Sequence, residues 1–432
     1  MDYKKHADDA MDFIRRLEAD GCRFPGSPEE KVACEKIQAE IKETGLEPRT
    51  EEFIYAPNAG IGIINKLGWA ALIFTGVYYI SVSAALVALL GFVGILVFAL
   101  TQIIRYTGMW DFVFKQEKAK NIISEVQPQS GKTDYSIFLG AHYDSSWCWK
   151  LAVKNPNTAI LKTAYGVVGI VVLIGLSILK ITFGYATFPI SADAYHAVNL
   201  ITLILPLVFI PGMFFVTQFT SQDKTIGSPG AMDNLTGIGI NIQLMKYFNE
   251  HPEALPENCR LVNVGFASEE AGLKGAKAYV AKHKSDPDFK NCYVINIDSI
   301  ADPEHFEAVK GDPWQGSHFD ENMISLTLDA MRESGIASPK TIVNPIGGCD
   351  STPFSNEGVP TLTIAAQDPR STTYYHTCND KSERFSVDTV ATGLEVVYRL
   401  IQKIGAQRGG RQEVQPNIQP NVQLDDEHPD EQ

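Results

Sequence analysis

Histidine and carboxylate residues stand directly after several short apolar segments of this chain, and strands of an α/β sheet carry their functional groups at such ends. The apolar residues 138–141 end in His142, and Asp144 follows two positions later. A neutral imidazole there can bind a metal ion while a carboxylate accepts its second N–H group. A lone His-x-Asp is weak evidence, because a histidine near a strand end is more often a hydrogen-bonded structural residue.

Further candidate ligands accompany His142, each at the edge of an apolar segment. They are Asp233, Glu270, Asp298 and His376. Two imidazoles and three carboxylates can hold two metal ions if Asp233 bridges them, because each ion then receives one histidine and one terminal carboxylate. This mixture of nitrogen and oxygen ligands suits zinc, with manganese or cobalt as alternative ions.

A two-metal centre activates water and polarises a carbonyl oxygen, but it needs a base that takes the proton. Glu269 is the natural candidate, since it adjoins Glu270 and successive side chains at a strand end point in opposite directions. One carboxylate of the pair can then bind a metal ion while the other lies over the attacking water. Residues 268–270 also fit a helix N-cap with an acidic first turn, and both interpretations can hold together.

Alternating strands and helices are expected to position these residues. The apolar patterns predict strands near residues 51–55, 118–126, 135–141, 260–267, 292–297 and 361–365. They predict helices near residues 7–20, 28–44, 230–248, 270–282, 322–334 and 387–404. This alternation is typical of an α/β domain with a mixed, largely parallel sheet sandwiched by helices.

Two segments almost without charge interrupt this pattern. Residues 67–104 are long enough for two bilayer crossings of about 20 residues each, with a turn at residues 81–83. Residues 163–179 and 197–219 form a second pair, in which lipid-embedded helices would tolerate Pro206 and Pro211. A single buried core helix at residues 67–104 would need a larger core than this chain can build. We therefore expect about four transmembrane helices in two hairpins, an integral membrane protein that contacts the lipid bilayer.

Composition and flanking charge narrow the function classes and the location. A formal net charge of −14 over 432 residues argues against nucleic-acid binding, which requires a basic surface. Seven cysteines without a C-x-x-C pair indicate reduced thiols, and the N-terminus lacks the apolar region of a signal peptide. Positive residues on the domain side of the hairpins predict a catalytic domain that faces the cytoplasm. These residues are Lys66, Arg105, Lys150, Lys154, Lys162 and Lys224, whereas the opposite turns carry little beyond Lys180.

The motifs around the candidate ligands resemble those of peptidase family M28, the co-catalytic dizinc aminopeptidases, whose relatives include glutamate carboxypeptidase, glutaminyl cyclase and the transferrin receptor. The resemblance extends over most of the chain outside the hairpins and implies a phosphorylase/hydrolase-like architecture. It is carried by Pro25-Gly26-Ser27, Asn121-Ile122-Ile123, Ala141-His142-Tyr143-Asp144-Ser145, Gly230-Ala231-Met232-Asp233-Asn234, Ala267-Ser268-Glu269-Glu270-Ala271-Gly272, Asn296-Ile297-Asp298, Cys349-Asp350, Phe354, Gly358-Val359-Pro360, Tyr375-His376-Thr377 and Asp380.

The resemblance also implies a role for each candidate ligand. One zinc ion would be held by His142 and Asp298, and the other by Glu270 and His376. Asp233 would bridge the two zinc ions.

Four further features are implied around these ligands. Glu269 would be the general base, and Asp144 would orient His142 from behind. The peptide bond between Asp233 and Asn234 would be cis. Tyr375 matches a tyrosine that stabilises the oxyanion in some members, although Tyr374 could serve instead or both could be packing residues.

The spacing between His142 and Asp233 departs from the family pattern. It amounts to 233 minus 142, or 91 positions, where a loop of ordinary length would suffice. The second hairpin fills this gap, so its two ends should lie beside the metal ligands and close to the bilayer surface. The resulting division of the chain is a peptidase domain at 1–61, 107–158 and 221–406, hairpins at 62–106 and 159–220, and a disordered acidic tail at 407–432.

The leading hypothesis is a membrane-anchored metallo-aminopeptidase, a zinc hydrolase that removes N-terminal residues from peptide substrates through a metal-bridging hydroxide. One alternative is a glutaminyl-peptide cyclase or a carboxypeptidase of the same fold. A third is a non-catalytic membrane receptor or scaffold, although such relatives lack ligands that this chain retains. The sequence fixes neither the preferred N-terminal residue nor the oligomeric state.

Overall fold

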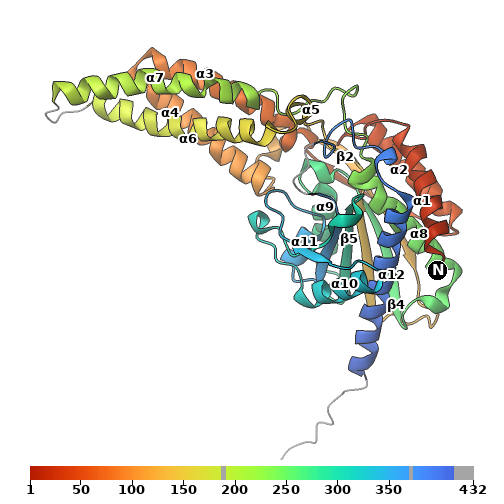
Figure 1. Ribbon diagram of the computed structural model, residues 1–432. Coiled ribbons are helices and arrows are strands. Elements are labelled where there is room, and N and C mark those ends of the chain that lie inside the picture. Colours follow the sequence, from red (N-terminus) through yellow and green to blue (C-terminus); the bar gives the residue numbers. More distant parts are fainter. Residues whose placement is uncertain (186–190, 369–372, 413–432) are drawn as a thin grey trace, which may run out of the picture.

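A mixed β-sheet forms the centre of the computed structural model, which describes residues 1–185, 191–368 and 373–412. Within these residues the sheet has eight strands in the order β1-β2-β4-β3-β5-β8-β6-β7 (Figure 1). The strands are β1 Arg49–Tyr55, β2 Glu117–Val126, β3 Tyr135–His142, β4 Cys259–Phe266, β5 Cys292–Ile300, β6 Phe306–Val309, β7 Lys340–Ile342 and β8 Thr361–Ala366.

The four central strands, β4, β3, β5 and β8, run parallel. Strand β3 is buried at every position, so its side chains alternate between two apolar layers. Ile137 and Leu139 join one hydrophobic cluster, whereas Phe138 joins another. Because the central strands are parallel, their carboxyl ends lie at one edge of the sheet.

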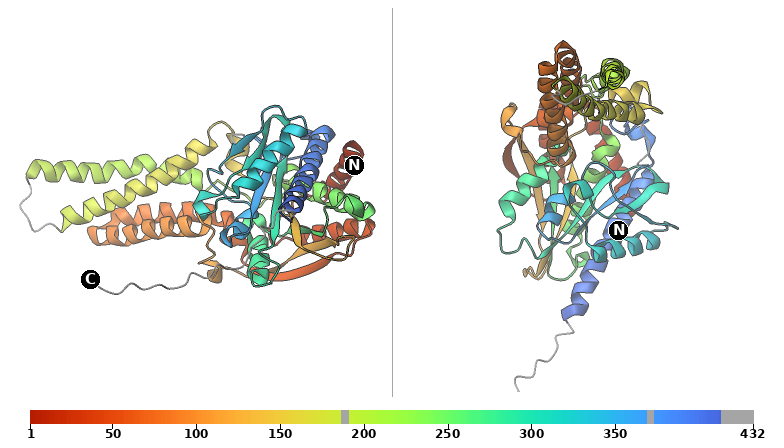
Figure 2. Two further views of the ribbon diagram at one scale, coloured as in Figure 1. Left: turned by 90° about the horizontal axis from the view of Figure 1, so that it is seen from below. Right: turned by 90° about the vertical axis from the view of Figure 1, so that its left-hand side faces the viewer.

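Helices cover both faces of the sheet (Figures 1 and 2). On one face, α1, α2, α8 and α12 enclose the larger cluster, and on the other, α9 and α11 pack on the smaller one. These helices and α10 span α1 Tyr3–Glu18, α2 Pro28–Glu43, α8 Thr236–Glu250, α9 Lys274–His283, α10 Glu321–Glu333, α11 Ser351–Asn356 and α12 Val387–Gln412.

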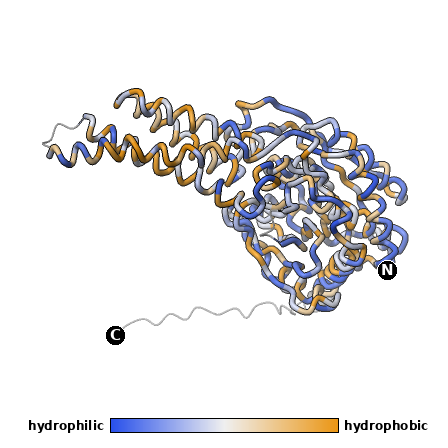
Figure 3. The backbone as a smooth tube through the Cα atoms, turned by 45° about the horizontal axis from the view of Figure 1, so that its top comes forward, coloured by the Kyte–Doolittle hydropathy of each residue, from blue (hydrophilic) through white to orange (hydrophobic). Residues whose placement is uncertain are grey.

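Four long apolar helices project from one side of the α/β domain as a separate bundle, as far as the described residues extend (Figures 1 and 2). Their candidate membrane-spanning segments have 20 to 26 residues, enough to cross a bilayer. The bundle is predominantly hydrophobic along its length (Figure 3). The helices are α3 Ile64–Ile80, α4 Val82–Phe98, α6 Ala159–Gly184 and α7 Ala192–Val216, and the short α5 Lys150–Lys154 precedes α6.

Small residues bring the bundle helices close together. A Cβ atom at Gly166 of α6 would lie 2.6 Å from the carbonyl oxygen of Gly212 in α7, so only glycine fits this contact. Pro206 and Pro211 both lie inside α7, which continues through them.

The predicted fold class is confirmed: the protein has an α/β fold with a mixed, mostly parallel sheet and four long apolar helices among its described residues. The break between α3 and α4 lies where the turn at residues 81–83 was predicted, but it is shorter: only Ser81 separates the helices, and Val82 and Ser83 belong to α4. Strands β6 and β7 were not predicted. Helix α12 continues to Gln412, and residues 413–432 of the expected disordered tail lie outside the described residues.

One sequence-based boundary was wrong in a way that matters for the site. A helix was expected from Glu270, with Ser268 as its N-cap. Instead, residues Glu269–Ala271 form a 3-10 turn, and α9 begins only at Lys274. Ser268 has a positive φ of 56° and makes no cap hydrogen bond, because its hydroxyl donates to Glu30.

Shortening a buried side chain of the central sheet should destabilise the domain. Ile295 of β5 is fully buried, so Ile295→Ala should lower the free energy of unfolding by about 2–5 kcal/mol. Ile54→Ala removes the same atoms from an edge strand where the side chain is 67% exposed, and it should change stability little. Denaturant titration of both variants in detergent checks this, and equal losses would contradict it.

Candidate metal centre

The five predicted ligands meet at the carboxyl edge of the parallel strands. His142 ends β3 and Asp298 lies near the end of β5. Asp233 lies in the turn Ala231–Leu235 before α8, and Glu270 lies in the 3-10 turn after β4. His376 follows β8 in the chain and has a positive φ of 54°.

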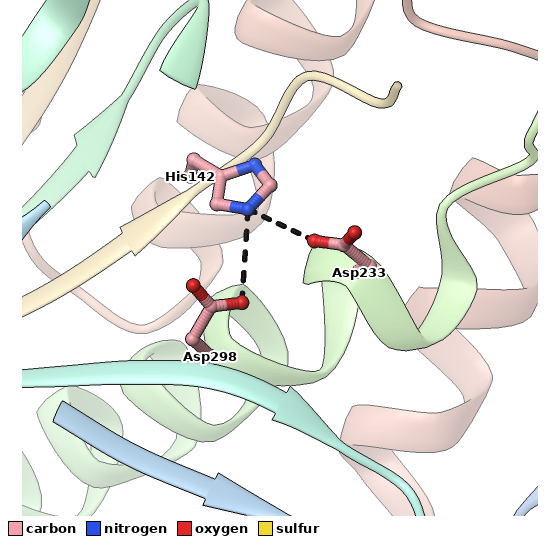
Figure 4. Close-up of side chains that lie close together, drawn as sticks. All are labelled: His142, Asp233 and Asp298. Atoms are coloured by element: carbon pink, nitrogen blue, oxygen red, sulfur yellow. Dashed lines mark ion pairs between the residues drawn. The ribbon is translucent and has the colours of Figure 1, made fainter. Parts of the chain in front are cut away.

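Their polar atoms form two groups that share Asp233. In the first, Nε2 of His142 lies 3.1 Å from Oδ1 of Asp233 and 3.8 Å from Oδ1 of Asp298 (Figure 4). In the second, Nε2 of His376 lies 3.0 Å from Oδ2 of Asp233 and 3.1 Å from Oε1 of Glu270. The two oxygens of Asp233 therefore face different histidines, as a bridging ligand requires.

The ligand atoms fit divalent cations. Among the described residues, Oδ2 of Asp233 and Oε1 of Glu270 are buried and accept no hydrogen bond. Burial alone would lower the pKa of His376, but the charges of Glu270 and Asp233 outweigh it and raise this pKa to about 10. The cluster thus stabilises positive charge, and its mixture of imidazole and carboxylate ligands is the mixture that zinc accepts.

Asp144 connects the first histidine to the loop of the predicted base. Its Oδ1 lies 3.5 Å from Nδ1 of His142. The same carboxylate accepts the backbone N–H groups of Glu269 and Glu270, at 3.0 and 3.1 Å. The carboxylate predicted to orient His142 therefore also fixes the Glu269–Glu270 turn.

Asp380 fixes the backbone around Asp233, the candidate bridging ligand. It accepts the backbone N–H groups of Met232 and Asp233, at 2.8 and 3.2 Å. Burial and the charge of Asp233 raise the pKa of Asp380 to about 7. The peptide bond between Asp233 and Asn234 is cis, as the resemblance implied.

A buried arginine holds the two loops together. Arg23 is fully buried and donates to the carbonyl oxygens of Tyr143, Pro229 and Gly230, at 2.8, 2.7 and 2.9 Å. Burial lowers the pKa of Arg23 to about 10, although Asp380 and Asp144 oppose this shift. Arg23 therefore keeps its charge at neutral pH and joins the loop after His142 to the loop before Asp233.

Glu269 lies half-buried in the same turn as Glu270. Burial and the carboxylates of Glu270 and Asp350 raise the pKa of Glu269 well above its ordinary value, against the opposing influence of His142. A raised pKa makes a carboxylate a stronger proton acceptor, which suits a general base. Glu30 of α2 supports this turn, since Ser268 Oγ donates to Glu30 Oε1 at 2.5 Å.

The two tyrosines before His376 have different surroundings. Tyr374 donates to Asp302, and the guanidinium of Arg384 covers its ring. The ring of Tyr375 stacks on His376 at 3.8 Å, and burial with the nearby carboxylates Asp233 and Glu270 raises the pKa of its phenol. Of the two, Tyr375 therefore lies at the candidate metal centre.

Sequence reasoning assigned no role to three residues around the site, although Asp350 belongs to one of the motifs that carry the resemblance. Arg23, Glu30 and Asp350 are all buried, and the first two bind the backbone or side chains of the site loops. The sequence offers one signal for Arg23 and Glu30, namely their position on either side of the Pro25-Gly26-Ser27 motif.

The second hairpin joins the domain beside these ligands, as its position between His142 and Asp233 predicted. Cys148, before α6, and Ser221, after α7, pair as an isolated β-bridge. The backbone N–H of Trp149 donates to the carbonyl oxygen of His376 at 2.7 Å, and the two rings meet edge-to-face at 4.7 Å. The base of the bundle therefore contacts a ligand loop directly.

Comparison with known proteins agrees with this geometry. The family model of peptidase family M28 matches residues 219–401. Aminopeptidase YwaD from Bacillus subtilis (strain 168) is 24% identical over 211 residues, which cover 45% of this chain and 42% of that protein. The match thus spans less than half of the relative's length.

Solved structures share the fold. A zinc aminopeptidase from Bacillus subtilis superposes with a TM-score of 0.55 at 14% identity, covering 92% of this chain and 95% of that one. A glutaminyl cyclase from Fimbriiglobus ruber superposes with a TM-score of 0.51 at 13% identity, covering 92% and 94%. The fold is therefore shared with zinc aminopeptidases and glutaminyl cyclases, and residues 219–401 of this chain match the model of peptidase family M28.

Proposed function

We propose that this protein is a membrane-anchored aminopeptidase that uses two zinc ions to hydrolyse the N-terminal peptide bond of peptides. The observation that carries the proposal is the position of Asp233, whose two carboxylate oxygens face His142 and His376 at 3.1 and 3.0 Å. Two zinc ions bound there would supply a water of lowered pKa and polarise the scissile carbonyl.

The protein's own residues perform the proton transfers in this proposal. Glu269 takes the proton of the attacking water and passes it to the leaving amine. Asp144 holds the Glu269 backbone in place, so the carboxylate needs little reorganisation when the substrate binds. The phenol of Tyr375 remains protonated at neutral pH because its pKa is raised, and it donates to the oxygen of the carbonyl under attack.

Glutaminyl cyclisation is the second candidate reaction, because a glutaminyl cyclase shares the fold. That acyl transfer needs a single zinc ion. The complete first group of His142, Asp233 and Asp298 favours a second ion and hence hydrolysis. A carboxypeptidase of the same fold would use the same ligands and differ only in which end of the peptide it binds.

The anchoring hairpins indicate where substrates come from. Both ends of the second hairpin lie at the His376 loop, so a bilayer around the bundle would bring the site close to the membrane surface. We propose that the enzyme degrades peptides released at the bilayer, with its catalytic domain in the cytoplasm.

Removing the base should abolish hydrolysis without removing the metal. Glu269→Gln should lower kcat for peptides by about 10²–10⁴-fold, because no group then accepts the proton of water. A mixed peptide library, read by mass spectrometry, should show stepwise loss of N-terminal residues with wild type only. Trimming from the C-terminus, or loss of ammonia from N-terminal Gln, would replace the assignment by a carboxypeptidase or a cyclase.

The number of bound zinc ions should fall when a histidine of either ligand group is removed. Wild type should hold about two zinc ions per chain, and His142→Ala and His376→Ala should each hold about one. His251→Ala is the matched control, because its side chain is 49% exposed and lies outside both groups. Elemental analysis of the purified variants checks this, and two ions retained in His142→Ala would contradict the two-site assignment.

The orientation of the protein in the membrane can be determined by labelling single introduced cysteines. In a Cys378→Ser background, Ser83→Cys at the far turn of the first hairpin should react with an impermeant maleimide in intact cells. Glu52→Cys on β1 of the domain should react only after the membrane is permeabilised, since the domain is expected on the cytoplasmic side. The reverse pattern would place the domain on the outer side.

A further inference from the structure

The segment that leaves the first hairpin returns to the active site. A π-helical turn, Ala99–Ile104, ends this hairpin, and Tyr106 follows two residues later with a positive φ of 50°. Lys277 of α9 donates to the carbonyl oxygens of both Tyr106 and Gly272. Gln315 donates to the carbonyl oxygen of Ile104 at 2.6 Å. These contacts fix the backbone of Tyr106 against the domain.

A partly buried charge pair reinforces the attachment. Asp111 accepts from Gln102 of the π-helical turn at 2.6 Å and from Lys274 at 2.5 Å. Lys274 is the first residue of α9, and α9 begins directly after the turn that holds Glu269. The end of the first hairpin and the loop of the catalytic base are therefore joined as one unit.

The side chain of Tyr106 lies between two loops of the site. Its ring covers Gly272, where a Cβ atom would lie 3.4 Å from ring carbons. Its hydroxyl lies 3.9 Å from the Cβ position of Gly347, three residues before Asp350. Gly272 follows Glu270 by two residues, so Tyr106 stands on the Glu269 side of the metal centre, whereas Tyr375 stacks on His376 at the other side.

The hydroxyl of Tyr106 is free to bind a substrate. It makes no hydrogen bond to any described residue, although the tyrosine is only partly exposed. Burial and the charges of Glu269 and Glu270 raise the pKa of this phenol, so it stays protonated at neutral pH and can donate. The hydroxyl is not among the buried polar atoms without a partner, so it is not enclosed by protein and a substrate acceptor can reach it.

We propose that the Tyr106 hydroxyl donates a hydrogen bond to the backbone of the peptide substrate on the leaving side of the scissile bond. This inference rests on the proposed peptidase function. Glu269 gives its proton to the leaving amine, so the leaving peptide lies on the side of the site where Tyr106 stands. The hydroxyl needs a hydrogen-bond acceptor, and the first backbone carbonyl oxygen on the leaving side of the scissile bond is such an acceptor. The first hairpin thus supplies a substrate-binding residue as well as an anchor.

The test compares two substrate classes with Tyr106→Phe, which removes only the hydroxyl and keeps the ring over Gly272. One class is a short peptide that begins with the residue wild type releases fastest. The other is the 4-nitroanilide of the same amino acid, which has no carbonyl group on its leaving side. We expect kcat/KM to fall about tenfold for the peptide and less than about twofold for the nitroanilide.

Tyr185→Phe is the matched control. Its hydroxyl pairs with Ser83 at the far end of the bundle, so neither substrate should be affected. Equal losses on both substrates with Tyr106→Phe, or no loss on either, would overturn the inference while leaving the peptidase function in place. Wild type that holds zinc but cleaves neither substrate would overturn the proposed function and this inference with it.

Discussion

The burial of many carboxylates at one edge of a sheet is the constraint on which this structure depends. Like charges a few ångströms apart repel strongly away from water, and an unpaired buried charge is costly. Fixed hydrogen-bond donors stabilise these carboxylates. Asp144 and Asp380 each accept two backbone N–H groups, and the buried Arg23 joins the loop after His142 to the loop before Asp233. Among the described residues, Asp233 Oδ2 and Glu270 Oε1 are buried atoms that accept no hydrogen bond and face a histidine, and two divalent cations would balance the charge of these carboxylates.

The same constraint explains why two inserted hairpins leave the site intact. Each is tied to a loop that already carries a site residue. The first is tied through Asp111 and Lys274 to the turn of Glu269, and the second through Trp149 to the backbone of His376. Because these contacts are polar or aromatic and local, the bundle can pack separately from the sheet while its base remains rigid with respect to the ligands.

The sequence predicts those elements of the structure that have a recognisable pattern of apolar residues. Long apolar runs reveal β3, β5 and the hairpins, and the polar residues near the ends of β3 and β5, His142 and Asp298, are candidate ligands. The short strands β6 and β7, of four and three residues, carry too few apolar residues to be recognised. Arg23 and Glu30 could not be predicted as site residues for another reason. A charged residue is expected at the surface, and only the tertiary structure shows that these two are buried next to the metal centre.

Attachment at the ligand loops also affects how a substrate of the proposed peptidase would reach the metal centre. A bundle anchored at a remote edge of the sheet would leave the site free to face any direction. Here Tyr106, at the end of the first hairpin, and Trp149, in the segment that leads to the second hairpin, flank the Glu269 and His376 sides of the centre. If the protein is the proposed peptidase, a peptide bound at the metal ligands would lie near both of these residues. In the proposed function, residues next to the hairpins would then contribute to substrate selection together with the α/β domain.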